Sequence, residues 1–141
     1  MKPVVIDTSV AVKWIISQNE KYLQQSDIIL NNIKNGTVKC YAPQLLLYEI
    51  GNVMISKHCT TSYMKRAFKT IYSLPLQLAF HDRKLAEKTI EISRESNITF
   101  YDASFIALAA SLRADLITEN IKHQGKYKGK EVKIVSLKDY R

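Results

Sequence analysis

The stretch Lys2-Pro-Val-Val-Ile-Asp-Thr-Ser-Val-Ala11 decides the fold class of this chain. Residues 4–6 form a short apolar run of β-branched side chains, which predicts a buried strand. Asp7-Thr8-Ser9 follows at once, and the apolar residues of 10–16 suit a helix. An acid at the carboxyl end of a parallel strand lies where open α/β sheets bind ligands. The same residue types also cap helices, so Asp7 alone leaves both roles open.

The rest of the chain alternates strand-like and helix-like segments. Further strands are expected at residues 38–42, 76–80, 115–118 and 133–136, and helices over 20–34, 44–57, 60–72, 83–95 and 101–112, with Pro43 at the first position of the 44–57 helix. Strands that alternate with helices indicate a parallel α/β sheet. We therefore expect an α/β fold in a single domain spanning residues 1–141.

The charge balance narrows the class of partner. The chain has 21 Lys and Arg against 13 Asp and Glu, a formal net charge of +8. That excess favours a polyanion, with nucleic acid first and a membrane surface second, although a basic chain can also be merely soluble. Cys40 and Cys59 form no C-x-x-C pair, which suits a reducing compartment. With neither a membrane-length apolar run nor a signal peptide, we expect a complete, cytoplasmic protein.

Three acids lie among apolar segments. Asp7 follows the buried strand, Glu49 borders the apolar stripe of the 44–57 helix, and Asp102 begins the most apolar helix, YDASFIALAASL. Carboxylates are rarely buried unless they are paired or bind a metal. If the three converge, their mutual repulsion requires a cation, and hard ions such as Mg²⁺ or Mn²⁺ take oxygen ligands of this kind.

Each of these acids also has an ordinary structural role. Asp102 in a first helical turn is favoured by the helix dipole, and Glu49 could be a solvated glutamate. Other chemistries fit the sequence poorly. The histidines have no ligand spacing for zinc, and Ser9 lacks the G-x-S-x-G context of a hydrolase nucleophile.

Four pieces in a fixed order make the chain resemble a family. They are Val-Ile-Asp7-Thr-Ser9-Val, Glu49-Ile-Gly-Asn52-Val, Tyr101-Asp102-Ala-Ser-Phe-Ile-Ala-Leu-Ala and Leu116-Ile-Thr118-Glu-Asn120. Together they resemble PIN-domain proteins, most closely the VapC-type ribonuclease toxins of toxin–antitoxin pairs. The resemblance implies a five-stranded parallel sheet flanked by helices, with acids at the carboxyl ends of the central strands.

The resemblance also implies the chemistry and the partners. It implies Mg²⁺- or Mn²⁺-dependent cleavage of RNA (tRNA, rRNA or mRNA), a small VapB-like antitoxin as a protein partner, and a homodimer. The implied metal ligands are Asp7, Glu49 and Asp102, and the implied supporting polar residues are Thr8 or Ser9, and Asn52. The family usually has a fourth Asp two residues after the Thr of the fourth strand. This chain has Asn120 at that place, with Glu119 beside it.

The chemistry suits the residues themselves. A bound divalent ion can activate water and neutralise charge on a phosphodiester, and a carboxylate can accept the proton. Phosphate contacts would come from basic stretches. One is the acid-free segment with Lys65, Arg66 and Lys69; the other is the Gly-punctuated loop 122–130 with Lys122, Lys126, Tyr127 and Lys128, in which the aromatic ring could stack on a base.

Other functions remain open at this point. A housekeeping PIN nuclease in RNA processing would use the same residues on another substrate, and a non-catalytic RNA-binding PIN-like domain would explain Asn120. A phospho-aspartate phosphatase would need an acid where Ser9 stands. A receiver domain would need its central Asp at the end of a strand, whereas Asp102 begins a helix.

Overall fold

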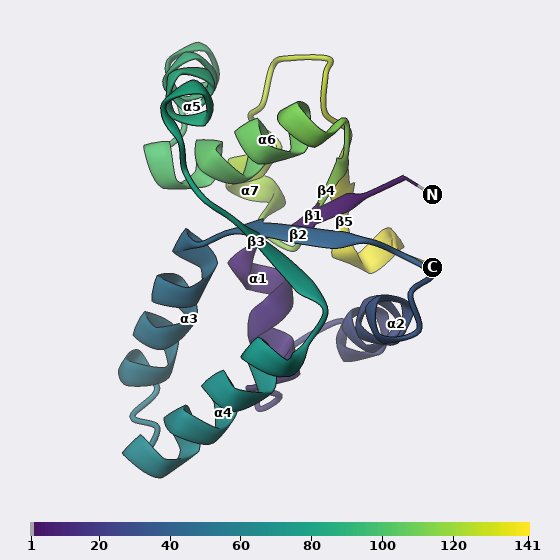
Figure 1. The fold of residues 1–141 in the computed structure, drawn as a ribbon, viewed down its shortest axis with the longest axis vertical. Helices are drawn as coiled ribbons and strands as arrows, with labels where there is room; N and C mark the ends of the chain where they lie inside the picture. Colours follow the sequence, from purple (N-terminus) through teal and green to yellow (C-terminus); the bar gives the residue numbers. More distant parts are fainter. Residues whose placement is uncertain (1) are drawn as a thin grey trace.

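The computed structural model describes residues 2–141 and has a parallel sheet at its centre (Figure 1). The strands are β1 (Val4–Ile6), β2 (Cys40–Pro43), β3 (Leu76–Ala79), β4 (Asp115–Thr118) and β5 (Ile134–Ser136). All five are parallel and lie in the order β3-β2-β1-β4-β5. The expected α/β fold with a five-stranded parallel sheet is confirmed.

Helices connect the strands and cover both faces of the sheet. They are α1 (Thr8–Ala11), α2 (Leu23–Lys34), α3 (Leu45–Ser56), α4 (Thr61–Ser73), α5 (Arg83–Ser96), α6 (Phe100–Leu112) and α7 (Ile121–Gln124), with 3₁₀ turns η1 (Val12–Trp14) and η2 (Leu137–Asp139). Figure 1 shows α1–α4 on one side of the sheet and α5–α7 on the other. Within residues 2–141, no helix is both long and apolar enough to cross a bilayer.

The order of the strands reverses between β1 and β4. The chain runs outward from β1 through β2 to β3 on one side, then returns to place β4 and β5 on the other side of β1. In open α/β sheets, ligands bind beyond the carboxyl ends of two strands whose connections leave in opposite directions; we call this place, beyond the ends of β1 and β4, the crevice. Asp7 directly follows β1, and Glu119 directly follows β4.

Helix α6 lies on the same face of the sheet as α5 and α7 (Figure 1). It packs against α5 on one side and against β1, β2 and β4 on the other. This double cover explains the nearly continuous apolar sequence, since residues 103–109 are all buried. Thr99 caps the helix by accepting a hydrogen bond from the Asp102 N–H at 3.0 Å, so Asp102 lies in its first turn.

Several expected boundaries change by a residue or two, and three differences matter. Pro43 is the last residue of β2 and not the first of a helix. The helix expected after Asp7 is a single α-turn that tightens into η1. Residues 121–124, expected in a loop, form α7, whose Gln124 side chain is buried. Its burial holds this turn against α6.

Gly51 gives a prediction about the packing of α3 on α4. A Cβ at this position would lie 3.5 Å from the Phe68 ring, an ordinary van der Waals distance. Gly51→Ala should therefore raise the free energy of unfolding by up to about 1 kcal/mol, through its helix propensity. Gly36→Ala should lower it by about 1 kcal/mol or more, because Gly36 has φ +76°. Urea unfolding of both variants tests this, and a destabilised Gly51→Ala variant would contradict it.

Candidate active site

Asp7 occupies the crevice between β1 and β4. Its side chain is buried, with 4 % of the residue exposed. One carboxylate oxygen, Oδ1, accepts hydrogen bonds from the Ser9 N–H at 3.1 Å and from the Ser9 hydroxyl. The other oxygen, Oδ2, accepts from the Thr118 hydroxyl at the end of β4. Asp7 therefore caps α1, and it also joins β1 to β4 through its side chain.

Burial changes the acidity of Asp7. Desolvation raises its pKa from 3.8 to about 6, against the opposing effect of the hydrogen bonds from Ser9 and Thr118, and the charge of Asp102 raises it further. A raised carboxylate pKa means that the charged form is not fully compensated by the protein around it. Strongly perturbed acids in a crevice are characteristic of functional sites.

Asp102 lies close enough for its charge to act on both Asp7 and Glu49. Glu49 is half-buried on α3, and its Oε1 accepts a hydrogen bond of 2.6 Å from the Thr8 hydroxyl. Burial and the charge of Asp102 both raise the pKa of Glu49. The acids thus come from β1, α3 and α6, three segments far apart in the sequence, and Asp102 acts on the charge of both others.

The donor set has the chemistry that a hard divalent cation prefers. All of these ligands are carboxylate oxygens, and their mutual repulsion would be relieved by a positive ion. Between residues 2 and 141, however, no three acidic, histidine or cysteine side chains lie together at the spacing of a metal site. Two of the oxygens already accept hydrogen bonds from Ser9 and Thr118. An ion would therefore require the Glu49 or Asp102 carboxylate to turn toward Asp7.

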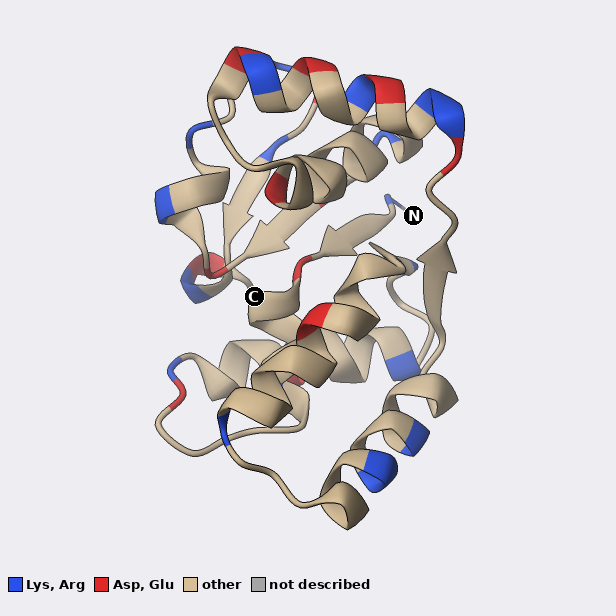
Figure 2. Cartoon of the chain, turned by 90° about the vertical axis from the view of Figure 1, so that its left-hand side faces the viewer, with Lys and Arg blue, Asp and Glu red and all other residues tan. Residues whose placement is uncertain are grey.

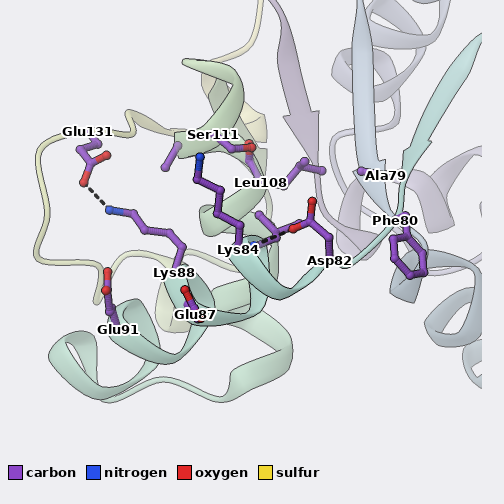
Figure 3. Close-up of a pocket in the computed structure, with 12 residues that line it drawn as sticks. Ala79, Phe80, Asp82, Lys84, Glu87, Lys88, Glu91, Leu108, Ser111 and Glu131 are labelled. Carbon is purple, nitrogen blue, oxygen red and sulfur yellow. Dashed lines mark hydrogen bonds and ion pairs between the residues drawn. The ribbon is translucent and has the colours of Figure 1, made fainter.

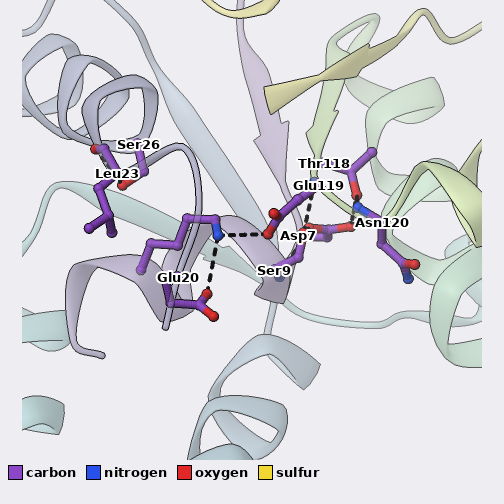
Figure 4. Close-up of polar contacts among 9 residues, drawn as sticks. Asp7, Ser9, Glu20, Leu23, Ser26, Thr118, Glu119 and Asn120 are labelled. Carbon is purple, nitrogen blue, oxygen red and sulfur yellow. Dashed lines mark hydrogen bonds and ion pairs between the residues drawn. The ribbon is translucent and has the colours of Figure 1, made fainter. Parts of the chain in front are cut away.

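Glu119 is turned to the other side of this crevice. Its carboxylate contacts the Lys13 ammonium at 2.6 Å, and Lys13 also pairs with Glu20 at 3.1 Å (Figure 4). The Lys13 side chain is fully buried. The backbone N–H of Glu119 donates to the Ser9 hydroxyl at 2.9 Å. Glu119 is thus engaged by a buried cation, and its charge is not free for an ion beside Asp7.

Asn120 contributes its backbone and not its side chain. The Asn120 N–H donates to the Thr118 hydroxyl oxygen at 2.7 Å. Figure 4 shows the Asn120 amide turned away from Asp7. Of the other expected supporting residues, Ser9 and Thr8 hold the acids, whereas Asn52 is exposed on α3. The structure therefore brings Asp7, Glu49, Thr8 and Ser9 together, with Asp102 nearby.

Three side chains of this region were not among the residues expected from the sequence. Thr118 binds Asp7, Lys13 binds Glu119, and buried Gln124 donates to the Asp102 carbonyl at 3.3 Å. Lys13 had a sequence signal, since it is a lone cation inside the apolar run Val10-Ala-Val-Lys-Trp-Ile-Ile16. The role of Gln124 had none, because it depends on α7 folding back onto α6.

The basic residues expected to bind RNA lie on two surfaces. Lys65, Arg66 and Lys69 are exposed on α4, a helix without a single acid, and Figure 2 shows its Lys and Arg along one side. The lysines of the second stretch, Lys122, Lys126 and Lys128, are exposed as well. Tyr127 is half-buried and packs in part against the core, so only part of its side chain is open for stacking.

A separate cavity of about 560 Å³ lies between α5, α6 and Glu131, away from Asp7. Charged side chains line much of it, and Figure 3 shows Lys88 reaching toward Glu131, at 2.6 Å. Four acids and two lysines line it, and none of these acids is buried. This cavity is therefore a polar surface hollow without a buried acid like Asp7.

Comparison with known proteins agrees with this geometry. Residues 4–128 match the PIN domain family. The chain belongs to the PIN domain family. The match includes β1, α3, α6 and β4, and so every element that carries an acid of the crevice. No curated protein sequence is significantly similar to this PIN domain.

Solved structures share its fold at low sequence identity. VapBC2 from Rickettsia felis, bound to a promoter DNA fragment, is 17% identical with a TM-score of 0.70, over 94% of this chain and 97% of that chain. VapBC-5 from Mycobacterium tuberculosis is 19% identical with a TM-score of 0.61, over 96% and 99%. VapC20 from M. tuberculosis, a sarcin-ricin loop cleaving toxin, is 14% identical with a TM-score of 0.64, over 80% and 86%.

The raised pKa of Asp7 predicts how stability depends on pH. The folded-state pKa of about 6 exceeds the ordinary 3.8, so the folded protein binds the proton more tightly than the unfolded chain does. In chelator, the free energy of unfolding should fall as the pH rises from about 4 to about 6, and stay low above that. Asp7→Asn should reduce this dependence to the part that Glu49 contributes, and should stabilise the protein at pH 7.5 by about 1–3 kcal/mol.

Urea unfolding at pH 5 and pH 7.5 measures the effect. Asp27→Asn, an exposed aspartate on α2, is the control and should keep the pH dependence of the wild type. An Asp7→Asn variant with the same pH dependence as the wild type would show that folding does not raise the pKa of Asp7.

Proposed function

We propose that this PIN domain is a Mg²⁺- or Mn²⁺-dependent endoribonuclease, the toxin of a VapBC-type pair. The observation that carries the proposal is the buried, incompletely compensated Asp7 at the switch point of the sheet, with Asp102 close enough for its charge to act on both Asp7 and Glu49. Such acids would bind a divalent cation, and the bound cation would in turn contact a phosphate of a polyanion. The formal net charge of +8 is consistent with an RNA substrate.

The ion would be held by Asp7 and Asp102, with Glu49 as the third acid. When bound, a divalent ion lowers the pKa of water and neutralises charge on the phosphate. Asn120 is neutral and turned away, and Glu119 is paired with Lys13. We therefore propose a single tightly held ion, because neither Asn120 nor Glu119 would supply a fourth carboxylate for a second.

The polar residues of the crevice would prepare the acids for this task. The Ser9 and Thr118 hydroxyls donate to Asp7 and fix the orientation of its carboxylate. Thr8 donates to Oε1 of Glu49, which leaves Oε2 available to accept a proton. Because the pKa of Glu49 is raised, this carboxylate is a better base than an exposed glutamate would be.

Two groups of exposed cations would bind the substrate. Lys65, Arg66 and Lys69 on α4, and Lys122, Lys126 and Lys128 after β4, are exposed. Contacts of this kind are made to phosphates and carry no sequence information. They would give salt-dependent affinity for RNA, while the choice of sequence would come from elsewhere.

The proposed toxin role rests on the fold and on an apolar surface. The Klebsiella pneumoniae neighbour, 15% identical with a TM-score of 0.67, is a toxin–antitoxin complex. In this PIN domain, Ile55, Met64 and Phe68 line a groove of about 460 Å³ between α3 and α4. An amphipathic helix of a small antitoxin would fit such a groove. A homodimer is also proposed, on family resemblance.

Removing an acid should abolish RNA cleavage. With Mn²⁺ and structured cellular RNA, we expect Asp7→Asn and Asp102→Asn to lower the cleavage rate roughly 100-fold or more, as loss of transition-state charge stabilisation does. Glu49→Gln should have an effect of similar size. The wild type should be inactive in chelator and regain activity with Mn²⁺.

Glu87→Gln is the matched control, because it removes the same charge from an exposed position on α5. It should cleave like the wild type. Cleavage that survives Asp7→Asn, or that proceeds fully in chelator, would contradict the proposed chemistry. A wild type that binds RNA but never cleaves it would favour a non-catalytic RNA-binding domain.

The partner prediction separates a toxin from an RNA-processing nuclease. The small protein encoded beside this gene should co-purify with the chain on co-expression. Ile55→Asn should weaken the complex and leave RNA cleavage intact, since Ile55 lies in the groove and not among the acids, and Asn adds no charge beside Lys65. Cells that make the chain alone should stop growing. Unhindered growth without any complex would favour the RNA-processing nuclease.

A further inference from the structure

An uncharged pocket of about 270 Å³ lies beside the acids, and the proposed function does not use it. Its principal walls are Pro43, Leu45, Tyr48, His81, Phe100 and Tyr101. We propose that this aromatic pocket binds one unpaired nucleobase of the RNA, next to the phosphate that is cleaved. The proposal rests on the proposed nuclease function and names the part of the substrate that the protein reads.

The position of the aromatic pocket follows from the topology. Pro43 ends β2, and His81 follows β3 by two residues. Strand β2 neighbours β1, whose carboxyl end leads to Asp7, and β3 lies on the other side of β2. Parallel strands lie about 4.8 Å apart, so the pocket occupies the same edge of the sheet as the crevice. Tyr48 also precedes Glu49 on α3, and Tyr101 precedes Asp102 on α6.

The walls suit a flat ring. Tyr48 is 77 % exposed and Tyr101 is 62 % exposed, although both line the pocket. Large aromatic rings are exposed at a cost, and exposed rings beside a nucleic-acid site offer stacking faces for unpaired bases. The volume lies just below the range of pockets that hold small organic ligands, about 300–1,000 Å³, which suits one ring system.

The polar groups also favour a base over a phosphate. No Lys, Arg, Asp or Glu lines the pocket within residues 2–141. His81 contacts Phe100 edge to face, with ring centroids 5.7 Å apart. Its Nε2 atom is buried and has no hydrogen-bond partner in the part of the chain that the structure describes. A buried polar atom without a partner is rare, and the edge of a base would supply one if the His81 ring turns toward the pocket.

Binding of abasic RNA tests the proposal. A short, labelled single-stranded RNA and the same strand without its bases are titrated into the protein in chelator, where no cleavage is expected. The wild type should bind the strand that has bases more tightly than the abasic strand. Tyr48→Ala and Tyr101→Ala should each weaken that binding roughly five- to 100-fold, the effect of losing one stacked base, and should leave binding of the abasic strand unchanged.

Control variants separate stacking from damage to the fold. Tyr48→Phe and Tyr101→Phe keep the ring and should bind like the wild type. Tyr22→Ala, at an exposed tyrosine before α2, should have no effect. His81→Phe keeps a ring against Phe100 but loses the nitrogen, so it should retain affinity and lose any preference among strands made of a single base type.

The two proposals fail in different ways. If Tyr48→Ala weakens both strands equally, or neither, the aromatic pocket does not bind a base. An unchanged affinity together with a weakened complex with the neighbouring small protein would assign the pocket to a protein side chain and overturn the proposal. Absence of cleavage with Mn²⁺ would overturn the nuclease function instead, and it would not affect the comparison in chelator.

Discussion

The contact that the rest of the structure depends on is the hydrogen-bonded burial of Asp7. Its carboxylate accepts hydrogen bonds from Ser9 on α1 and from Thr118 on β4. These contacts link the ends of β1 and β4, the two strands between which the order of the strands reverses. Asp7 thus joins the ends of β1 and β4 through its hydrogen bonds, and it is also the acid placed to bind a ligand between them. Its raised pKa shows that these hydrogen bonds do not fully offset the loss of water.

Charge is distributed around this contact in two separate groups. Lys13, whose side chain is fully buried, pairs with the partly exposed Glu119 and Glu20. Within residues 2–141, no ion pair joins a cation to Asp7, Glu49 or Asp102. A buried charge left without a partner is costly, and the pairing of Lys13 with the two glutamates avoids that cost for the lysine. Asp7 retains such a cost, and a divalent ion would relieve it.

The surface around the crevice divides the tasks that a nuclease must perform. The acids would hold the ion, the exposed lysines would hold phosphates without regard to sequence, and the aromatic pocket would read one base. The apolar groove between α3 and α4 lies farther along the same helix that carries Glu49 and Tyr48. A partner helix in that groove would thus be close to the substrate-binding surface, which suits inhibition of a toxin by its antitoxin.

The sequence by itself determined the fold class, because period and composition are local properties. β-Branched runs predicted the strands, and Asp82 and Gly36 marked helix ends that the structure has. The four motif pieces, in their order along the chain, also identified Asp7, Glu49 and Asp102 as candidate site residues. Only the tertiary structure decided that Glu119 faces Lys13, that Tyr127 packs in part against the core and that Tyr48 and Tyr101 face one pocket. Those outcomes depend on how distant elements pack, and side-chain direction at a strand end is set by the turn that follows it.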